Sequence, residues 1–169
     1  MRVQVSQMQR PIVFLDIDGV LNSEQWYSQA ASRKGEPSTQ TPTQRSLLER
    51  SIDPACVQRL NRLLQRTCAV VVVSSSWRKN HRISEIISIL DARGFCGEVI
   101  GATPSDEGMQ SRGEEITSWL KMNAPRDIAY VAVDDEVETG LPTAVVVVTS
   151  RNTGLTDEDV ERAVRILSR

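Results

Sequence analysis

Five short apolar runs that alternate with helix-like segments constrain the fold of this chain most strongly. The runs lie at residues 11–15, 69–73, 98–101, 128–133 and 144–148. The second run is an alanine followed by four valines, which is typical of a strand buried on both faces of a parallel sheet. Since strands and helices alternate, short right-handed crossovers predict an α/β fold with a doubly wound parallel sheet and helices on both faces.

Three of the predicted helices begin at recognisable caps. Asp53 precedes a proline, a residue favoured at the first helical position, and this helix is predicted to end near Thr67. Ser111 and Thr156 are each followed three residues later by an acidic residue, which is typical of a capping box. A further helix is predicted from about Asn80, with a buried stripe made of Ile83, Ile86, Ile87 and Leu90.

We interpret residues 1–169 as a single domain with a small cap or flap insertion at about 22–52. The insertion is longer than an ordinary strand-to-helix loop and has few periodic apolar residues. The net charge of −2 gives no general reason to bind nucleic acid or anionic lipid. No segment approaches the roughly 20 apolar residues of a membrane span, so a cytoplasmic protein with no membrane partner is expected.

The three cysteines are Cys56, Cys68 and Cys96. They are odd in number and far apart, which argues against a disulfide framework or a thiolate zinc site. Cys68 and Cys96 lie beside or within apolar runs, so both are predicted to be small core residues.

Polar side chains follow three of the apolar runs. Asp16 and Asp18 follow the first run, Ser74 follows the second, and Asp134 and Asp135 follow the fourth. The carboxyl ends of parallel strands meet at one edge of a sheet, where open α/β sheets bind ligands. Neighbouring carboxylates repel each other unless a cation or a shared proton offsets their charge. The pattern therefore predicts a metal site or acid/base chemistry at this edge.

Arg112 opens a predicted helix, where a positive charge is unfavourable for the helix dipole. An anion bound between the guanidinium and the helix would reverse that effect. Taken singly, each of these polar residues has an ordinary explanation as a turn, a cap or a surface charge. Their order along alternating strands and helices is what indicates a phosphate-binding site.

The sequence resembles the haloacid dehalogenase (HAD) superfamily of phosphotransferases, whose fold is Rossmann-like. The matching segments are FLDIDGVLN as motif I, VVVVSSSWR as motif II, Arg112 in SRGEEITSWL as motif III, and VAVDDE as motif IV. SSSWR together with RGEEITSWL is further similar to the HAD domains associated with bacterial and phage RNA-repair proteins. Motif III is more often lysine in the superfamily, and arginine supplies the same charge with a fixed fork geometry.

The resemblance implies that Asp16 is the nucleophile and Asp18 the general acid and base. A carboxylate can attack phosphorus, and the resulting aspartyl-phosphate divides hydrolysis into two easier steps. Ser74 would donate a hydrogen bond to a phosphoryl oxygen, with Ser75 as the alternative serine in this role. Arg112 would neutralise charge on the equatorial oxygens.

The same resemblance implies a Mg²⁺ cofactor. Asp16, Asp134 and Asp18, the last through its backbone carbonyl, would hold the ion, because oxygen ligands beside a phosphate favour magnesium. Asp135 would act either through a water molecule or by supporting the ligands.

The predicted function is therefore a magnesium-dependent phosphomonoesterase, acting on a phosphorylated small molecule, a nucleotide or a nucleic-acid end. Trp77 and Arg78 follow motif II as possible substrate contacts. The insertion offers further aromatic and basic residues, namely Trp26, Tyr27, Arg33 and Lys34. These residues could stack on a base and bind phosphate, or the aromatic side chains could pack on the domain.

Two alternatives belong to other functional classes. A receiver-type signalling domain is also doubly wound, but it carries its phosphoacceptor alone on the third strand, whereas here Asp-x-Asp comes first. A non-catalytic HAD-like binding module would have no need of the full set of charged residues.

Overall fold

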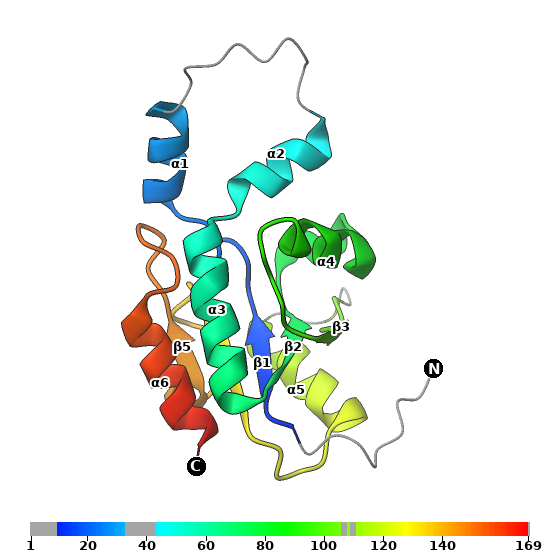
Figure 1. Cartoon of the computed structure of the whole chain (residues 1–169). Helices are drawn as coiled ribbons and strands as arrows, with labels where there is room; N and C mark the ends of the chain where they lie inside the picture. The colour runs from blue at the N-terminus through cyan, green and yellow to red at the C-terminus, as the bar shows by residue number, and fades with distance from the viewer. Residues whose placement is uncertain (1–9, 33–42, 106–107, 109–110, 169) are drawn as a thin grey trace.

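A five-stranded, entirely parallel sheet forms the centre of the computed structural model, which describes residues 10–32, 43–105, 108 and 111–168. The strand order is β3-β2-β1-β4-β5. The strands are β1 (Ile12–Leu15), β2 (Val70–Val73), β3 (Val99–Ala102), β4 (Tyr130–Asp134) and β5 (Val146–Val148) (Figure 1). All five coincide with the predicted apolar runs, so the predicted parallel sheet is confirmed.

Helices cover both faces of the sheet, which confirms the doubly wound α/β architecture. Val13 and Leu15 belong to the core that also contains side chains of α3 (Pro54–Thr67), α4 (Ile83–Asp91) and α6 (Asp157–Leu167). Ile12 and Phe14 point to the other face, where they pack with Ile116 and Trp119 of α5 (Arg112–Asn123). Alternate residues of one strand therefore serve two cores, as expected for a central strand.

The predicted caps are found in the structure. Asp53 accepts a hydrogen bond from the backbone N–H of Ala55 at 2.8 Å. Ser111 accepts from the backbone N–H of Glu114 at 3.2 Å, which fixes the start of α5 at Arg112. Thr156 forms the reciprocal capping box at the start of α6.

The helix predicted from about Asn80 begins later than expected. Ser76–Lys79 form a short 3₁₀ turn, η2, and the α-helix begins at Ile83. Its fully buried residues are Ile86, Ile89 and Leu90, so Ile89 takes the core position that was predicted for Ile87. Ile83 is partly buried against the same core, and Ile86, Ile89 and Leu90 also share one face at helical spacing, so periodicity alone allowed either stripe.

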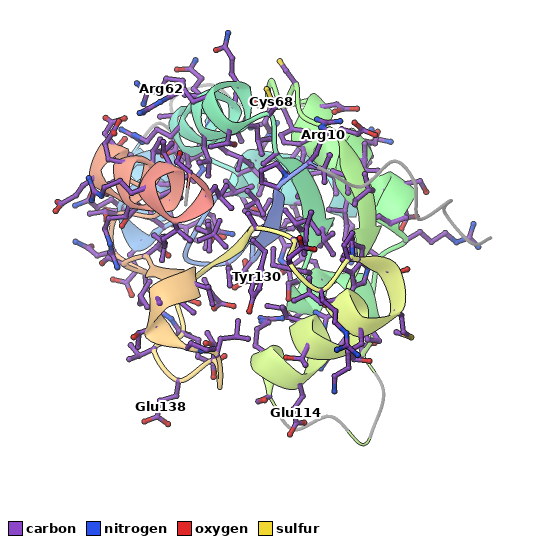
Figure 2. The ribbon with its side chains drawn as sticks, turned by 90° about the horizontal axis from the view of Figure 1, so that it is seen from below. Arg10, Arg62, Cys68, Glu114, Tyr130 and Glu138 are labelled. Carbon is purple, nitrogen blue, oxygen red and sulfur yellow. The ribbon has the colours of Figure 1, made fainter. Side chains whose placement is uncertain are left out.

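The prediction for two of the cysteines is wrong. Cys68 and Cys96 are exposed, and Cys56 is the buried cysteine. Cys68 ends α3 in the left-handed conformation with φ 54°, and its carbonyl accepts a hydrogen bond from Arg10 at the edge of the molecule (Figure 2). A chain reversal at this position turns the side chain away from the core that the following valines enter.

The segment at 22–52 carries two helices, α1 (Glu24–Ser32) and α2 (Gln44–Ser51), beyond the carboxyl ends of the strands (Figure 1). The backbone N–H of Asp53 donates to the carbonyl of Leu21 at 2.8 Å, so the chain enters and leaves this segment at one point. The assignment of the whole chain to one domain with this insertion stays a prediction. Among the helices that the structure describes, none is both long and apolar enough to span a bilayer.

The position of β4 creates the crevice for a site. From β1 the chain builds outward through β2 and β3, and it then returns through α5 to place β4 on the other side of β1. A crevice opens where adjacent strands lead their crossovers in opposite directions. The first and fourth strands end at this crevice with Asp16 and Asp134.

Candidate active site

A row of polar residues crosses the sheet. Each of them lies one position after the last apolar residue of its strand. Leu15 is aligned with Val73 and with Val133, so the next residues, Asp16, Ser74 and Asp134, are neighbours in register. Backbone hydrogen bonds continue the ladder, since Asp16 N–H donates to the Val133 carbonyl at 3.0 Å and Ser74 N–H to the Leu15 carbonyl at 2.8 Å. Sheet register therefore gathers residues that lie more than a hundred positions apart.

Arg112 joins the two central carboxylates from the start of α5. Its Nε lies 2.9 Å from Oδ2 of Asp134, and its Nη2 lies 3.6 Å from Oδ1 of Asp16. All three side chains are largely buried, with Asp16 5% and Asp134 2% exposed as residues. The carboxylates supply the negative charge that a cation at a helix N-terminus requires.

Burial and mutual repulsion disfavour the charged forms of these acids. Burial first, and repulsion from Asp134 second, raise the pKa of Asp16 from its ordinary 3.8 to about 7. The Arg112 guanidinium lowers this pKa but does not offset the burial. Burial also raises the pKa of Asp134, again against the influence of Arg112. One guanidinium is therefore too little positive charge for the acids gathered here, which favours a further cation.

Asp135 completes an acidic cluster that fits a divalent cation. Within the described residues, Asp16, Asp134 and Asp135 are the group able to hold a metal, with one carboxylate oxygen of each within 4.8 Å of the others. Three carboxylates provide the hard oxygen ligands of Mg²⁺ or a similar ion. The structure thus brings the Asp135 carboxylate directly to the cluster, while Asp18 is not among its three carboxylates.

Gly19 is required by this arrangement. It adopts φ +71°, and a Cβ atom built on it would lie 2.6 Å from Oδ2 of Asp135. Its N–H donates to Oδ1 of Asn22 at 2.9 Å, which closes the turn after β1. A side chain at this position would therefore collide with the acidic cluster.

Asp18 lies at the same pocket but remains exposed to solvent. The indole Nε1 of Trp77 donates to its Oδ2 at 3.0 Å, and the amide of Asn22 donates to its Oδ1 at 2.8 Å. Trp77 is itself only 9% exposed. In the structure its indole binds the Asp18 carboxylate, and the substrate contact at Trp77 stays a prediction.

The serines of motif II are divided between two contacts. Ser74 is buried, and its hydroxyl lies 3.3 Å from that of Thr103, a polar residue that sequence reasoning missed. The hydroxyl of Ser75 hydrogen-bonds to Asp16 and helps to lower its pKa. Ser76 lines the pocket. The choice between Ser74 and Ser75 as phosphate donor stays a prediction.

Arg78 is buried beside the pocket and has several partners. Its guanidinium donates to the carbonyls of Thr103, Ser75 and Pro104, and it pairs with Glu115. Glu115 also lies 3.6 Å from the Arg112 guanidinium, one turn away on α5. Glu115 was missed in the sequence, although the i, i+3 spacing from Arg112 is its signal. These contacts fix the Arg78 guanidinium beside the pocket, and the substrate contact at Arg78 stays a prediction.

The aromatic residues of the insertion differ in position. Tyr27 is 47% exposed and lines the pocket of about 470 Å³ that contains the acidic residues. Trp26 instead donates its indole N–H to the Arg50 carbonyl at 2.9 Å and packs under the Arg93 guanidinium, 5.6 Å away. The predicted contacts at residues 33 and 34, Arg33 and Lys34, lie outside the described residues.

Arg151 is a second cation at this pocket that the sequence did not reveal. It follows β5 on the loop before α6 and pairs with Asp135. Only the folded loop brings it there, because it lies 16 positions from its partner with no motif around it.

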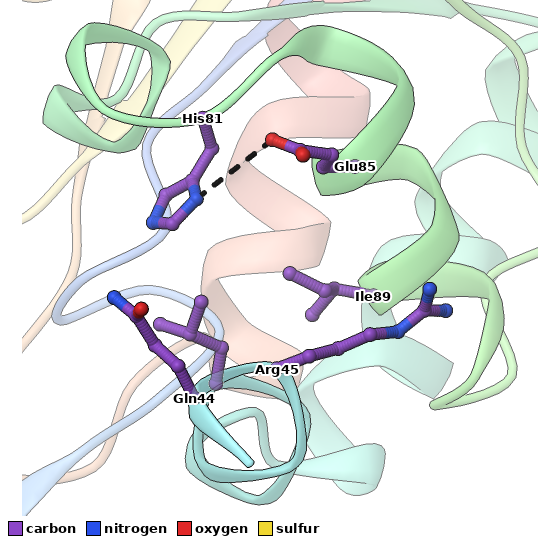
Figure 3. A pocket seen from close by; sticks show the side chains of 6 residues that line it. Gln44, Arg45, His81, Glu85 and Ile89 are labelled. Atoms are coloured by element: carbon purple, nitrogen blue, oxygen red, sulfur yellow. Dashed lines mark ion pairs between the residues drawn. The ribbon is translucent and has the colours of Figure 1, made fainter.

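A second pocket, of about 210 Å³, lies between α2 and α4 (Figure 3). Gln44 and Arg45 line one side, and His81, Glu85 and Ile89 line the other. His81 Nδ1 lies 4.0 Å from Glu85, and neither residue contributes to the acidic cluster. The histidine, alone of its type in the chain, is therefore separate from the candidate active site.

Comparison with known proteins agrees with this architecture. No curated protein and no solved structure matches the chain significantly. One protein family, described as the HAD domain in Swiss Army Knife RNA repair proteins, matches residues 12–160. This match covers every strand of the sheet and all the residues of the acidic cluster. The chain therefore belongs to the family of HAD domains found in Swiss Army Knife RNA repair proteins.

Proposed function

We propose that this protein is a phosphomonoesterase that works through an aspartyl-phosphate on Asp16 and requires a divalent cation, Mg²⁺ by the chemistry of its ligands. The observation that carries the proposal is the convergence of Asp16, Asp134 and Arg112 from β1, β4 and α5 into one pocket. Family membership supports phosphatase-type chemistry for such a pocket. The substrate is a phosphorylated small molecule or a nucleic-acid end.

In the first step, a carboxylate oxygen of Asp16 attacks phosphorus, and the bond from phosphorus to the leaving oxygen breaks. Asp18 donates a proton to that oxygen, so the leaving group departs as an alcohol. The hydrogen bonds from Trp77 and Asn22 hold Asp18 in place for this transfer. In the second step Asp18 takes a proton from water, which attacks phosphorus and releases phosphate and the Asp16 carboxylate.

Arg112 would stabilise the negative charge on the equatorial oxygens of the transferring group. Its guanidinium already contacts both Asp16 and Asp134, so it is directed at the place where that group would lie. Ser74 or Ser75 would donate a further hydrogen bond from the end of β2.

Asp16, Asp134 and Asp135 would hold the cation, with the backbone carbonyl of Asp18 as a further ligand. When bound, the ion supplies positive charge that neutralises the phosphate and the acidic cluster. The raised pKa of Asp16 supports this role for the ion, because ionised Asp16 is the form that attacks and a bound cation would favour that form.

Release of inorganic phosphate tests the proposal. The wild-type protein and Asp16→Asn are assayed with nucleotides, sugar phosphates and RNA or DNA oligonucleotides that carry a 3′ or 5′ phosphate, in magnesium or in EDTA. We expect turnover by the wild type in magnesium alone and none by Asp16→Asn. Hydrolysis in EDTA would contradict the cation requirement, and an absence of turnover throughout would favour a non-catalytic binding module.

A further inference from the structure

The candidate pocket contains two arginines at different depths. Arg112 has a side chain only 14% exposed and contacts the two central carboxylates. The Arg151 side chain is 75% exposed and lies at the mouth of the pocket. The proposed phosphoryl transfer uses the inner arginine and leaves the outer one without a role.

The backbone that carries Arg151 is fixed, although its side chain is exposed. Ser150 and Gly154 pair across the loop, and the Gly154 N–H donates to the Ser150 carbonyl at 2.7 Å. Before the loop, Thr149 donates its hydroxyl to the carbonyl of Gly19 at 2.8 Å, next to the acidic cluster. The Arg151 side chain therefore starts from a fixed point near the cluster. Its guanidinium is largely exposed although it pairs with the largely buried Asp135 carboxylate, so it can also reach an anion that enters the pocket.

The same loop is joined to the helix that carries Tyr27. The N–H of Glu24 donates to the Arg151 carbonyl at 2.9 Å, and the N–H of Gln25 donates to the Asn152 carbonyl at 3.1 Å. Arg151 and Tyr27 thus lie on two segments connected at their backbones, and both line the pocket. Tyr27 is half exposed, so a flat ring in the pocket could stack on it.

Resting on the proposed function, we propose that Arg151 and Tyr27 form a recognition subsite for the nucleotide that carries the phosphate to be removed. The guanidinium would bind the neighbouring internucleotide phosphate, and the phenol ring would stack on the adjoining base. An exposed cation and an aromatic ring that line the same pocket match a phosphate and a base of one strand end better than a sugar phosphate, which has no flat ring to stack.

The charge at the pocket mouth limits how many phosphates can be bound there. Glu24 and Glu136 are exposed and line the same pocket, and the described part of its lining offers Arg112 and Arg151 as its positive side chains. A long polyanion would be repelled by these carboxylates. The subsite is therefore suited to one phosphate beyond the scissile one, as at the end of a strand.

The test compares two substrates that differ in this recognition element. One is a dinucleotide with a terminal phosphate, in both its 3′ and 5′ forms, and the other is ribose 5-phosphate, which has neither a second phosphate nor a flat ring. For Arg151→Gln we expect kcat/KM to fall roughly tenfold or more further on the preferred dinucleotide than on ribose 5-phosphate, mainly through KM. Arg62→Gln is the matched control. Arg62 is an exposed arginine of α3 at the edge of the molecule, and it pairs with Asp157 of α6 (Figure 2).

Two further variants test the ring. Tyr27→Phe keeps the stacking surface and should keep the preference for the dinucleotide, whereas Tyr27→Leu should lower it. Equal losses on both substrates in Arg151→Gln, or equal preferences in the two Tyr27 variants, would overturn the subsite while leaving the phosphatase assignment intact. Wild-type protein that hydrolyses neither substrate in magnesium would instead overturn the proposed function, and the subsite with it.

Discussion

The Nε atom of Arg112, at the start of α5, lies 2.9 Å from Oδ2 of Asp134, at the end of β4, the strand that follows this helix in the chain. This contact places a fixed positive charge at the edge of the sheet where the acidic residues of β1 and β4 meet.

Arg112→Ala should weaken inhibition by vanadate at least tenfold, because a charge-assisted hydrogen bond to an oxyanion contributes about 1.5–3 kcal/mol. Arg112→Lys should recover part of the loss, since it keeps the charge but not the fork. Inhibition constants and melting temperatures are measured in parallel in magnesium. If vanadate affinity and thermal stability decline to the same degree, Arg112 is a structural residue.

Asp16→Asn should make the free energy of unfolding of the metal-free protein fall less as the pH rises. Folding raises the pKa of Asp16 from 3.8 to about 7, so its favourable contribution is complete below pH 3.8 and is lost as the pH rises through 7. From pH 5 to pH 8 this one group should lower the free energy of unfolding of the wild type by roughly 2–3 kcal/mol. Urea unfolding in EDTA at the two pH values measures the loss.

The control for this pH dependence is Asp127→Asn, which alters an exposed carboxylate far from the cluster. It should retain the wild-type slope of stability against pH. If Asp16→Asn also retains that slope, Asp16 does not titrate in the folded protein as its burial requires.

Magnesium should raise the melting temperature of the wild type by about 5 °C at saturating concentration, because a ligand that binds only the folded state stabilises it. Asp134→Asn and Asp135→Asn should each reduce this rise, since both carboxylates belong to the cluster. Glu138→Gln, an exposed acid at the edge of the molecule, is the control (Figure 2). If magnesium raises the melting temperature of Asp135→Asn as much as that of the wild type, Asp135 supports the ligands without binding the ion.

Glu115→Gln should reduce vanadate affinity roughly fivefold, as expected for the loss of an interaction of about 1 kcal/mol that orients Arg112. Glu115 lies between the guanidinium groups of Arg112 and Arg78, with its side chain 12% exposed. The adjacent and exposed Glu114 provides the control, Glu114→Gln. If the vanadate affinity of Glu115→Gln, measured well below its melting temperature, equals that of the wild type, Glu115 supports folding only.

Much of the fold follows from local sequence signals. Strands such as Val70–Val73 are apolar runs that have no stable place except inside a sheet, and Asp53, Ser111 and Thr156 mark helix starts by their own hydrogen bonds. The polar residues at strand ends were predictable for the same reason, because parallel strands put their carboxyl ends together.

Other features depend on distant contacts. Only the folded chain brings Arg78 to Glu115, Asp135 to Arg151, and the indole of Trp77 to Asp18. Cys68 is exposed because it is itself the left-handed residue that ends α3. The apolar run beside it in the sequence favoured a buried position instead.

The most direct test of the account is chemical capture of the intermediate on Asp16. The protein is mixed with a substrate that it hydrolyses in magnesium, quenched during turnover and reduced with borohydride, which converts an aspartyl-phosphate to homoserine. Mass spectrometry of the peptide that contains residue 16 should show homoserine there. With p-nitrophenyl phosphate, whose leaving group needs no proton from Asp18, the Asp18→Asn variant should show more of it because its second step lacks a base. Continued turnover with Asp16 unmodified, or by Asp16→Asn, would contradict the account.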